Sequence, residues 1–200
     1  MVNSYLENGS RLFVKRNTVI YEQGTTGDGF YLVNEGKIKI SMKVFNEKNR
    51  ILEILGKGQL FGEQSLDQNS YFSTATALEN SVVYYFTSKQ FQDLVIKSKY
   101  FRNLFYSSMI NKLKQLGAII QLKSLSVEVQ LANSLLELCH KYNSCEIPLN
   151  QQQLSNYTGL TRITIYKIVK EWKDLRLIIE KEGKLFIGNP KLLQEYVNTT

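Results

Sequence analysis

The chain has few of the residues that build covalent or metal-held sites. Its 200 residues include two cysteines, Cys139 and Cys145, and one histidine, His140. Two cysteines in a chain of this length do not make a disulfide framework. Cys139 and His140 are sequence neighbours, so on a helix they point in different directions and make a poor metal set. We expect no metal and no cofactor, and interpret the three as a half-buried thiol, a loop thiol and a surface imidazole.

A redox-sensing cysteine pair is the alternative interpretation of Cys139 and Cys145. The thiolate is the reactive form of cysteine, so a sensing pair would be favoured by evidence of a lowered thiol pKa. Whether these two residues sense the redox state is left open by the sequence.

Long hydrophobic runs and catalytic motifs are also missing. No run approaches the roughly 18 apolar residues of a membrane span. The first residues, MVNSYLENGSRLF, lack the basic start and apolar core of a secretory signal. We therefore expect a cytoplasmic protein with no membrane partner. There is no nucleophile–base pair, and Gly56-Lys57-Gly58 lacks the spacing of a Walker-type phosphate loop, so the chain is not expected to be an enzyme.

The excess of positive charge suits a polyanionic partner. The net charge is +7 and the pI is about 9.3. Residues 126–200, however, hold nine basic and eight acidic residues, so most of the excess lies before them. DNA binding by the C-terminal part would have to rely on the local placement of a few cations, which are Arg162, Lys167, Lys170, Lys173 and Lys184.

Short strands and glycine-rich turns are predicted from Arg11 to Phe86. The turns include Asn34-Glu35-Gly36 and Gly56-Lys57-Gly58. Regular short strands between such turns favour a sandwich or a barrel. The candidate strands are Leu12–Val14, Val19–Tyr21, Gly29–Val33, Lys37–Val44, Ile51–Leu55, Ser73–Ala77 and Val82–Phe86.

Helical periodicity begins near Ser88, a candidate N-cap for a short helix over Lys89–Ile96. A long helix is then predicted over Tyr100–Ser124. Its apolar residues recur at nearly the spacing of a coiled-coil seam, and they are Phe105, Met109, Leu113, Leu116 and Ile120. We favour a dimer seam with part of the stripe on the barrel, because one small barrel cannot cover so long a helix. The alternative is that the whole stripe packs on its own barrel.

Gly117 lies within this seam and would allow a partner helix to approach closely. A short hinge around Ser124–Ser126 follows, and Ser126 is a candidate cap for the next helix, Val127–Lys141. One face of that helix is apolar, formed by Val127, Leu131, Leu135 and Leu138.

The segment Gln151–Leu177 has the layout of a helix-turn-helix. Asn150 and Gln153 form a capping box for a short first helix. Gly159 ends that helix where a left-handed residue is needed, and Thr161 can cap a second helix. The apolar residues that should face inward are Ile165, Ile168, Val169 and Trp172. An ordinary pair of packed helices is the alternative.

A hairpin is predicted directly after this pair. Leu177–Ile179 and Leu185–Ile187 are short apolar-rich runs that flank Lys181-Glu182-Gly183-Lys184. A hairpin in this position would make the segment a winged helix-turn-helix, whose second helix enters the DNA major groove by its N-terminal residues. The residues that this layout predicts at DNA are Asn150, Gln151, Thr161, Arg162, Ile163, Thr164, Tyr166, Lys167, Lys170 and Lys184.

Taken in order along the chain, these features resemble the cAMP receptor protein/FNR (Crp/Fnr) family of bacterial transcription regulators. The resemblance covers nearly the whole chain. The matching segments are Ile20–Gly24 at the first barrel turn, Phe30–Ile38 in the following strand and turn, Gly58–Glu63 at the start of the phosphate-binding cassette, and Ser155–Ile179 in the helix-turn-helix.

The resemblance also implies an effector pocket, with one important departure. In family members that bind cyclic nucleotide, a cassette Glu holds the ribose and a cassette Arg pairs with the phosphate. Glu63 matches the first, but Ser73 stands at the arginine position. A phosphate buried there without its cation would be largely unpaired, so we expect no cAMP binding. We expect Glu63 to bind backbone donors of the cassette turn instead. The candidate pocket residues are Gly62, Glu63, Ser73, Thr74, Gln115 and Leu116.

Two other sensing modes of the family are excluded on composition. The iron–sulfur branch needs cysteines near the N-terminus, and a haem sensor needs a histidine in the barrel. The first cysteine here is Cys139, and the one histidine is His140.

The recognition helix departs from the family at two positions. Well-known members carry Glu where this chain has Ile163, and Arg where it has Lys167. A carboxylate can accept a hydrogen bond from cytosine N4, whereas isoleucine can contact only the methyl of thymine. We predict that Arg162 reads a guanine or clamps a phosphate, that Ile163 touches thymine, and that Tyr166 and Lys167 contact bases or backbone. A solvated face is the alternative for the last two.

The expected fold is α+β, with an N-terminal cyclic-nucleotide-binding-like β-barrel (jelly roll), a long dimerisation helix and a C-terminal winged helix-turn-helix. We expect an effector-sensing domain over residues 1–98, the dimer helix and hinge over 99–125, and a DNA-binding domain over 126–200. The expected partners are double-stranded DNA and a second copy of the chain, with RNA polymerase and an unidentified small-molecule effector as further candidates. An effector-sensing module whose C-terminal domain contacts protein is the alternative function.

Overall fold

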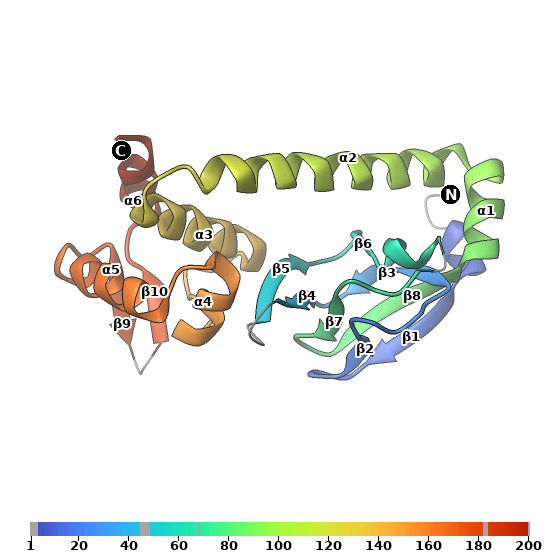
Figure 1. Cartoon of the computed structure of the whole chain (residues 1–200), viewed down its shortest axis with the longest axis horizontal. Helices are drawn as coiled ribbons and strands as arrows, with labels where there is room; N and C mark the ends of the chain where they lie inside the picture. The colour runs from blue at the N-terminus through green and yellow to red at the C-terminus, as the bar shows by residue number, and fades with distance from the viewer. Residues whose placement is uncertain (1–3, 45–48, 68, 182–183, 200) are drawn as a thin grey trace. The chain divides into compact units, whose positions relative to one another are not determined.

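The computed structural model describes residues 4–44, 49–67, 69–181 and 184–199. The chain forms two compact units, residues 1–115 and residues 116–200 (Figure 1). The boundary falls within one long helix, α2 (Lys99–Leu122). No helix in the described ranges combines the length and apolarity that a bilayer crossing requires.

The first unit is built on two four-stranded antiparallel sheets, with strand orders β1-β8-β3-β6 and β2-β7-β4-β5. This confirms the predicted jelly-roll-like class. The seven predicted strands are present, β2 with the predicted bounds and the others with shifted ends, and sequence analysis missed the two-residue strand β6. The strands are β1 (Ser10–Val14), β2 (Val19–Tyr21), β3 (Gly29–Glu35), β4 (Ile38–Lys43), β5 (Asn49–Leu55), β6 (Leu60–Phe61), β7 (Thr74–Ala77) and β8 (Ser81–Thr87).

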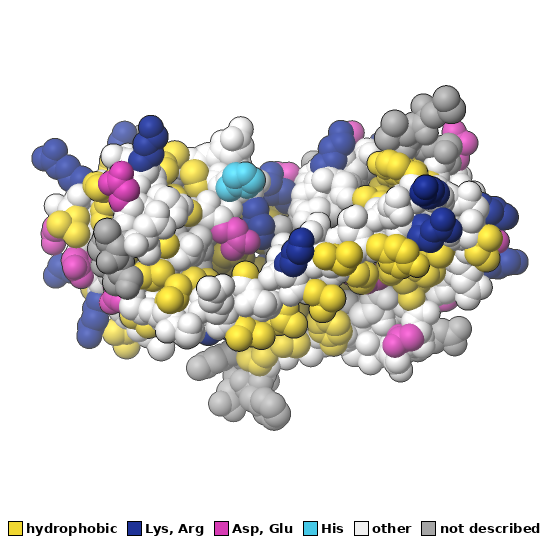
Figure 2. All heavy atoms as spheres, turned by 90° about the horizontal axis from the view of Figure 1, so that it is seen from above, with side chains coloured by type: hydrophobic (Ala, Val, Ile, Leu, Met, Phe, Trp, Pro, Cys, Tyr) yellow, Lys and Arg dark blue, Asp and Glu magenta, His cyan; other side chains and the backbone are white. Residues whose placement is uncertain are grey.

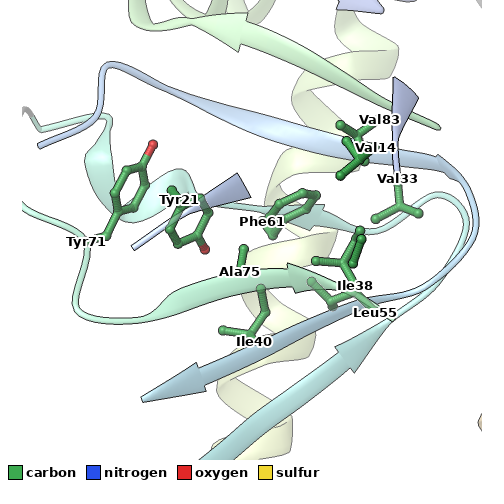
Figure 3. Packing of buried hydrophobic residues seen from close by; sticks show 11 residues of the cluster. Val14, Tyr21, Val33, Ile38, Ile40, Leu55, Phe61, Tyr71, Ala75 and Val83 are labelled. Atoms are coloured by element: carbon green, nitrogen blue, oxygen red, sulfur yellow. The ribbon is translucent and has the colours of Figure 1, made fainter. Parts of the chain in front are cut away.

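The core of this unit lies between the two sheets. Inward-facing residues of both sheets meet there, and Figure 3 shows Phe61 in the middle of the cluster. At one end of the cluster, Tyr21 of β2 stacks on Tyr71, with ring centroids 3.9 Å apart. A second apolar cluster joins Phe30 and Phe86 to Phe101 at the start of α2. This cluster fixes the first turns of α2 on the unit.

Helix α1 (Ser88–Lys97) begins one residue earlier than predicted. Its N-cap is Thr87, because the Thr87 hydroxyl accepts from the amide of Gln90 while the Gln90 side chain accepts from the amide of Thr87. The prediction of Ser88 as cap is wrong, since two reciprocal hydrogen bonds favour the Thr87–Gln90 pair. Two short 3-10 helices, η1 (Ser4–Asn8) and η3 (Glu63–Ser65), complete the unit.

The second unit is helical with a small sheet. It contains α3 (Val127–Tyr142), α4 (Gln151–Thr158), α5 (Arg162–Asp174), β9 (Ile178–Lys181), β10 (Lys184–Ile187) and α6 (Pro190–Thr199). Ser126 caps α3 as predicted, and Leu131, Leu135 and Leu138 are fully buried, but Val127 is exposed. Val127 is the first residue of α3, whereas Val129 and Gln130 in the same turn are buried.

The predicted hairpin is confirmed, with Ile187 paired to Ile178 and Lys184 paired to Lys181. Its turn, Glu182 and Gly183, lies outside the described residues. A third short segment extends the hairpin: the amide of Ile147 donates to the carbonyl of Leu185 at 2.8 Å. Sequence analysis missed this segment, and it also missed α6, whose Leu193 is fully buried.

Candidate functional site

The turn between α4 and α5 has the local geometry that its sequence predicts. The capping box of α4 is complete, with Gln153 N to Asn150 Oδ1 and Asn150 N to Gln153 Oε1 both at 2.9 Å. Gly159 ends α4 with φ of 79°, a left-handed conformation that costs glycine little. The Thr161 hydroxyl then accepts from Thr164 N and caps α5. These contacts fix where α5 begins.

Helix α5 has one buried face and one exposed face. Ile165, Ile168, Val169 and Trp172 are buried as predicted. On the opposite face, Ile163 is 69% exposed and Tyr166 is 56% exposed. Arg162, Lys167 and Lys170 are also exposed. A large aliphatic and an aromatic side chain held in solvent beside cations fit a surface that contacts another molecule.

The other predicted DNA residues are partly used within the chain. Asn150, Thr161 and Thr164 take part in the caps described above, and Gln151 is half-buried. Lys184 on β10 forms an ion pair with Glu146 at 2.8 Å, and Lys173 is paired with Glu180. The contacts of all these residues with DNA stay predictions.

In the first unit, the cassette turn joins β6 to η3. Gly62 has φ of 79°, and a Cβ added there would lie 3.2 Å from the Tyr21 ring and 3.1 Å from the Tyr31 ring, so glycine suits this position. The carboxylate of Glu63 accepts from the ammonium of Lys112 on α2. The same ammonium donates to the carbonyl of Leu60 at 3.1 Å. The prediction that Glu63 binds backbone donors of the turn is therefore wrong: its partner is a lysine of the long helix.

Lys112 was not singled out by sequence analysis. Lys112 lies 49 residues after Glu63, so the sequence does not show that the two side chains pair. The one available indication was that a lysine stands about one helical turn before Gln115, a predicted pocket residue. Burial lowers the pKa of Lys112 to about 8, and the negative charge of Glu53 opposes this shift. The ammonium is still mostly charged at pH 7. The second carboxylate oxygen of Glu63, Oε2, is buried and has no hydrogen-bond partner among the described residues.

The remaining pocket candidates divide into two groups. Ser73 is fully buried, and its hydroxyl accepts from the Gln64 side chain at 2.9 Å. The Thr74 hydroxyl accepts from the amide of Gln23 at 3.0 Å and so holds β7 to β2. Gln115 and Leu116, by contrast, are exposed on α2. Gly62, Glu63, Ser73 and Thr74 thus belong to the cassette itself, and the part of Gln115 and Leu116 in a pocket stays a prediction.

The predicted dimer stripe of α2 also divides along its length. Phe105 packs on the aromatic cluster of the first unit, and Met109 is half-buried. Leu113, Leu116 and Ile120 are between 55% and 68% exposed. Further large apolar residues, Tyr106, Ile110 and Ile119, are exposed on the same helix. Figure 2 looks down on α2 and shows hydrophobic side chains gathered on this face.

Comparison with known families matches both parts of the chain. Residues 11–98 match the family described as Cyclic nucleotide-binding domain, and residues 129–196 match the family described as Crp-like helix-turn-helix domain. These two ranges agree with the sandwich of the first unit and with the capped helix pair of the second.

Relatives over the full length are transcription regulators. The chain is 24% identical over 189 residues to the Cyclic AMP receptor protein of Thermus thermophilus, covering 92% of this chain and 86% of that protein. It is also 24% identical over 197 residues to the Nitrogen fixation regulation protein FixK of Rhizobium meliloti, covering 96% and 90%.

Solved structures show the same fold. A Crp/Fnr-family transcriptional regulator of Thermus thermophilus superposes with a TM-score of 0.82 at 19% identity, covering 94% of this chain and 98% of that one. FixK2 of Bradyrhizobium japonicum gives a TM-score of 0.76 at 16% identity, covering 94% and 96%.

Proposed function

The chain belongs to the Crp/Fnr family of transcription regulators, and we propose that it acts as a homodimer that inserts α5 of each subunit into successive major grooves of DNA. One observation carries this proposal: the first turns of α5 hold Arg162, Ile163, Tyr166 and Lys167 in solvent while the opposite face is buried. In a helix-turn-helix, these N-terminal turns are the part that contacts base edges.

Each of the four exposed residues has a proposed role. Arg162 donates to a guanine or to a phosphate, and Ile163 contacts a thymine methyl. Tyr166 and Lys167 contact bases or backbone. Asn150, Gln151, Thr161, Thr164, Lys170 and Lys184 are proposed to lie around them, and contacts from the cations to phosphate make the binding steeply dependent on salt.

The homodimer is proposed to form through α2. This helix exposes more apolar surface than is usual for a helix on the outside of a monomer, through Leu113, Leu116 and Ile120. Packing it against a second copy removes these side chains from water. Nothing lies within 4 Å of a Cβ built on Gly117, so this side of the helix is open to a partner. Two recognition helices then read half-sites about 34 Å apart on a pseudo-palindromic operator.

The signal sensed by the first unit is proposed to be something other than cAMP. The arginine that the family uses for the cyclic phosphate is replaced by Ser73, which is buried and bonded to Gln64. Glu63, the family's ribose ligand, is held by Lys112. A cyclic nucleotide in this position would place its phosphate where Ser73 replaces the family's arginine, and it would have to displace Lys112 from Glu63.

The pair between Lys112 and Glu63 also suggests how the cassette is linked to α2. Removing either charge leaves the other buried and unpaired, so the pair fastens the middle of α2 to η3. At the other end, the ammonium of Lys123 donates to the carbonyl of Thr158, the last residue of α4, at 2.7 Å, and to Gln130 at 3.2 Å. We propose that a signal at the cassette changes the first contact and reaches α4 through the second.

The functional division of the chain stays as predicted: residues 1–98 sense the signal, 99–125 dimerise and relay it, and 126–200 bind DNA. The regulator is proposed to have no catalytic activity of its own. RNA polymerase and a small-molecule effector are proposed further partners.

Selection of bound sequences from a random duplex pool tests the function. We expect an enriched two-fold symmetric site, and we expect Ile163→Glu to shift one position in each half-site from thymine to cytosine. Enrichment of a site that already requires cytosine there would contradict the role of Ile163. Failure to enrich any sequence at moderate salt would contradict DNA recognition and favour a C-terminal domain that contacts protein.

A further inference from the structure

The two cysteines of the second unit lie together. The Sγ atoms of Cys139 and Cys145 are 3.9 Å apart, and the Cys139 thiol donates toward Cys145. Both are free thiols, with Cys139 half-buried and Cys145 exposed. A disulfide needs the sulfurs at about 2.0 Å. The remaining approach of about 2 Å is within reach of side-chain rotation and a small backbone shift.

Two backbone features hold the thiols in this arrangement. Asn143 ends α3 in a left-handed conformation with φ of 48°, and the amide of Ser144 donates back to the carbonyl of Cys139 at 3.1 Å. This is a Schellman turn, which folds the chain back over the last turn of the helix. The carbonyl of Cys145 then accepts from the amide of Ile187 at 2.9 Å. The meeting of the two sulfurs is therefore fixed by the helix end on one side and by the wing sheet on the other.

We propose that Cys139 and Cys145 form an oxidisable dithiol, which a peroxide converts into an intramolecular disulfide. The two thiols have different parts in this reaction. Cys145 is exposed and is the sulfur that a peroxide can reach. Burial raises the pKa of the Cys139 thiol, and its contact with Cys145 adds to this shift, so Cys139 is the less reactive of the two towards peroxide.

The chemistry balances with one peroxide for each disulfide. The Cys145 thiolate attacks one oxygen of the peroxide, the O–O bond breaks, and Cys145 becomes a sulfenic acid while an alcohol or water leaves with a proton. The Cys139 sulfur then attacks the Cys145 sulfur. The S–O bond breaks, the S–S bond forms, and the hydroxyl leaves as water with the proton of Cys139. The two thiols lose two electrons, which reduce the peroxide.

The consequence for DNA rests on the proposed function. Closing the sulfur–sulfur distance pulls the segment around Cys145 towards α3. Glu146 in that segment pairs with Lys184, and Ile147 bonds to Leu185, so the pull acts directly on strand β10 of the wing. We expect the disulfide to weaken operator binding by about tenfold, since it displaces a cation proposed to contact phosphate.

Intact-mass measurement of the full chain after hydrogen peroxide treatment tests the proposal. The wild type should lose two hydrogen atoms per chain, recover them with a phosphine reductant, and resist thiol alkylation while oxidised. Cys139→Ser and Cys145→Ser should show no such loss. If the wild type only gains oxygen atoms, or forms only disulfides between chains, the dithiol proposal is overturned.

Operator titration of the same samples separates this inference from the proposed function. Reduced wild type and peroxide-treated Cys145→Ser should bind equally well, and oxidised wild type about tenfold more weakly. Failure of the reduced wild type to prefer its operator would contradict the proposed function and leave the mass result standing. Equal binding by oxidised and reduced wild type would overturn the link to the wing.

Discussion

The two units of the molecule use their polar side chains in opposite ways. In the second unit, polar residues around α4 and α5 satisfy helix ends close by in sequence, and the outer face of α5 is left to solvent. In the first unit, the cassette residues that the family uses for a ligand are engaged inside the chain, Glu63 by Lys112 and Ser73 by Gln64. The proposed DNA-binding surface is thus exposed, whereas the polar groups of the cassette are already bonded to other groups of the chain.

The largest expected effect concerns the exposed face of α5. Arg162→Ala should weaken operator binding by about a hundredfold or more, because a good bidentate base contact is worth about 1–3 kcal/mol and a dimer makes it twice. The free energy of unfolding should stay unchanged, since Arg162 is exposed. Fluorescence anisotropy with a labelled operator and urea unfolding measure the two quantities. Lys191→Ala, at an exposed position of α6, is the control. If Arg162→Ala lowered the free energy of unfolding and left the operator affinity unchanged, the assignment of this face to DNA would be wrong.

The next largest effect concerns the cassette, where Lys112 pairs with Glu63. Lys112→Met should lower the free energy of unfolding of the first unit by about 1–3 kcal/mol, because the buried Glu63 carboxylate loses its donor. Lys114→Met, on the same helix and exposed, should have little effect. Urea unfolding followed by the fluorescence of the first unit's tyrosines is the measurement.

A double-mutant cycle then identifies the pair. Adding Glu63→Gln to Lys112→Met should recover part of the loss, since the unpaired charge is removed. Additive losses in the double variant would mean that the two side chains do not depend on each other.

These two regions differ in how far the sequence predicts them. The caps at Asn150, Thr161 and Gly159 were predictable because each involves residues within a few positions of one another, where spacing determines geometry. The pair between Glu63 and Lys112 was not, because it depends on how α2 lies across the cassette. The N-cap of α1 was wrongly predicted at Ser88 because the neighbouring Thr87 has Gln90 three residues later, and these two residues form the capping box. The segment at Ile147 was missed because it is too short to show the alternation of apolar and polar residues by which strands are predicted.

Two glycines test the contrast between a position fixed by its backbone conformation and a position on an exposed helix face. Gly159→Ala should lower the free energy of unfolding of the second unit by about 1–2 kcal/mol, because its φ of 79° is costly for alanine. In the unassociated chain, Gly117→Ala should raise the free energy of unfolding by up to about 1 kcal/mol, because Gly117 is helical and no other atom lies near the added Cβ. Chemical denaturation of both variants decides this, and the same sign for both would contradict the assigned conformations.

A further effect is a pH dependence of the stability of the first unit. The folded pKa of Lys112, about 8, lies below its ordinary value of 10.5, so the unfolded chain binds more protons between these values. The Lys112 contribution to the free energy of unfolding therefore rises with pH over that window, by at most about 1.4 kcal/mol per unit. Burial raises the pKa of Tyr21 and Tyr31 above 10, so their contribution falls as pH rises beyond 10.

The net expectation is a rise in stability from about pH 8 to pH 10, followed by a fall. Lys112→Met should abolish the rise and keep the fall. Urea midpoints at a series of pH values measure both. A wild type and a Lys112→Met variant with the same pH profile would show that Lys112 titrates normally.

The most direct test of the central proposal is an equilibrium titration of the purified chain against its selected operator and a scrambled duplex of equal length. We predict two chains per duplex, a preference of about a thousandfold for the operator, and affinity that falls steeply with salt, all without added cAMP. Equal affinity for both duplexes at moderate salt, or binding of a single chain, would contradict the account.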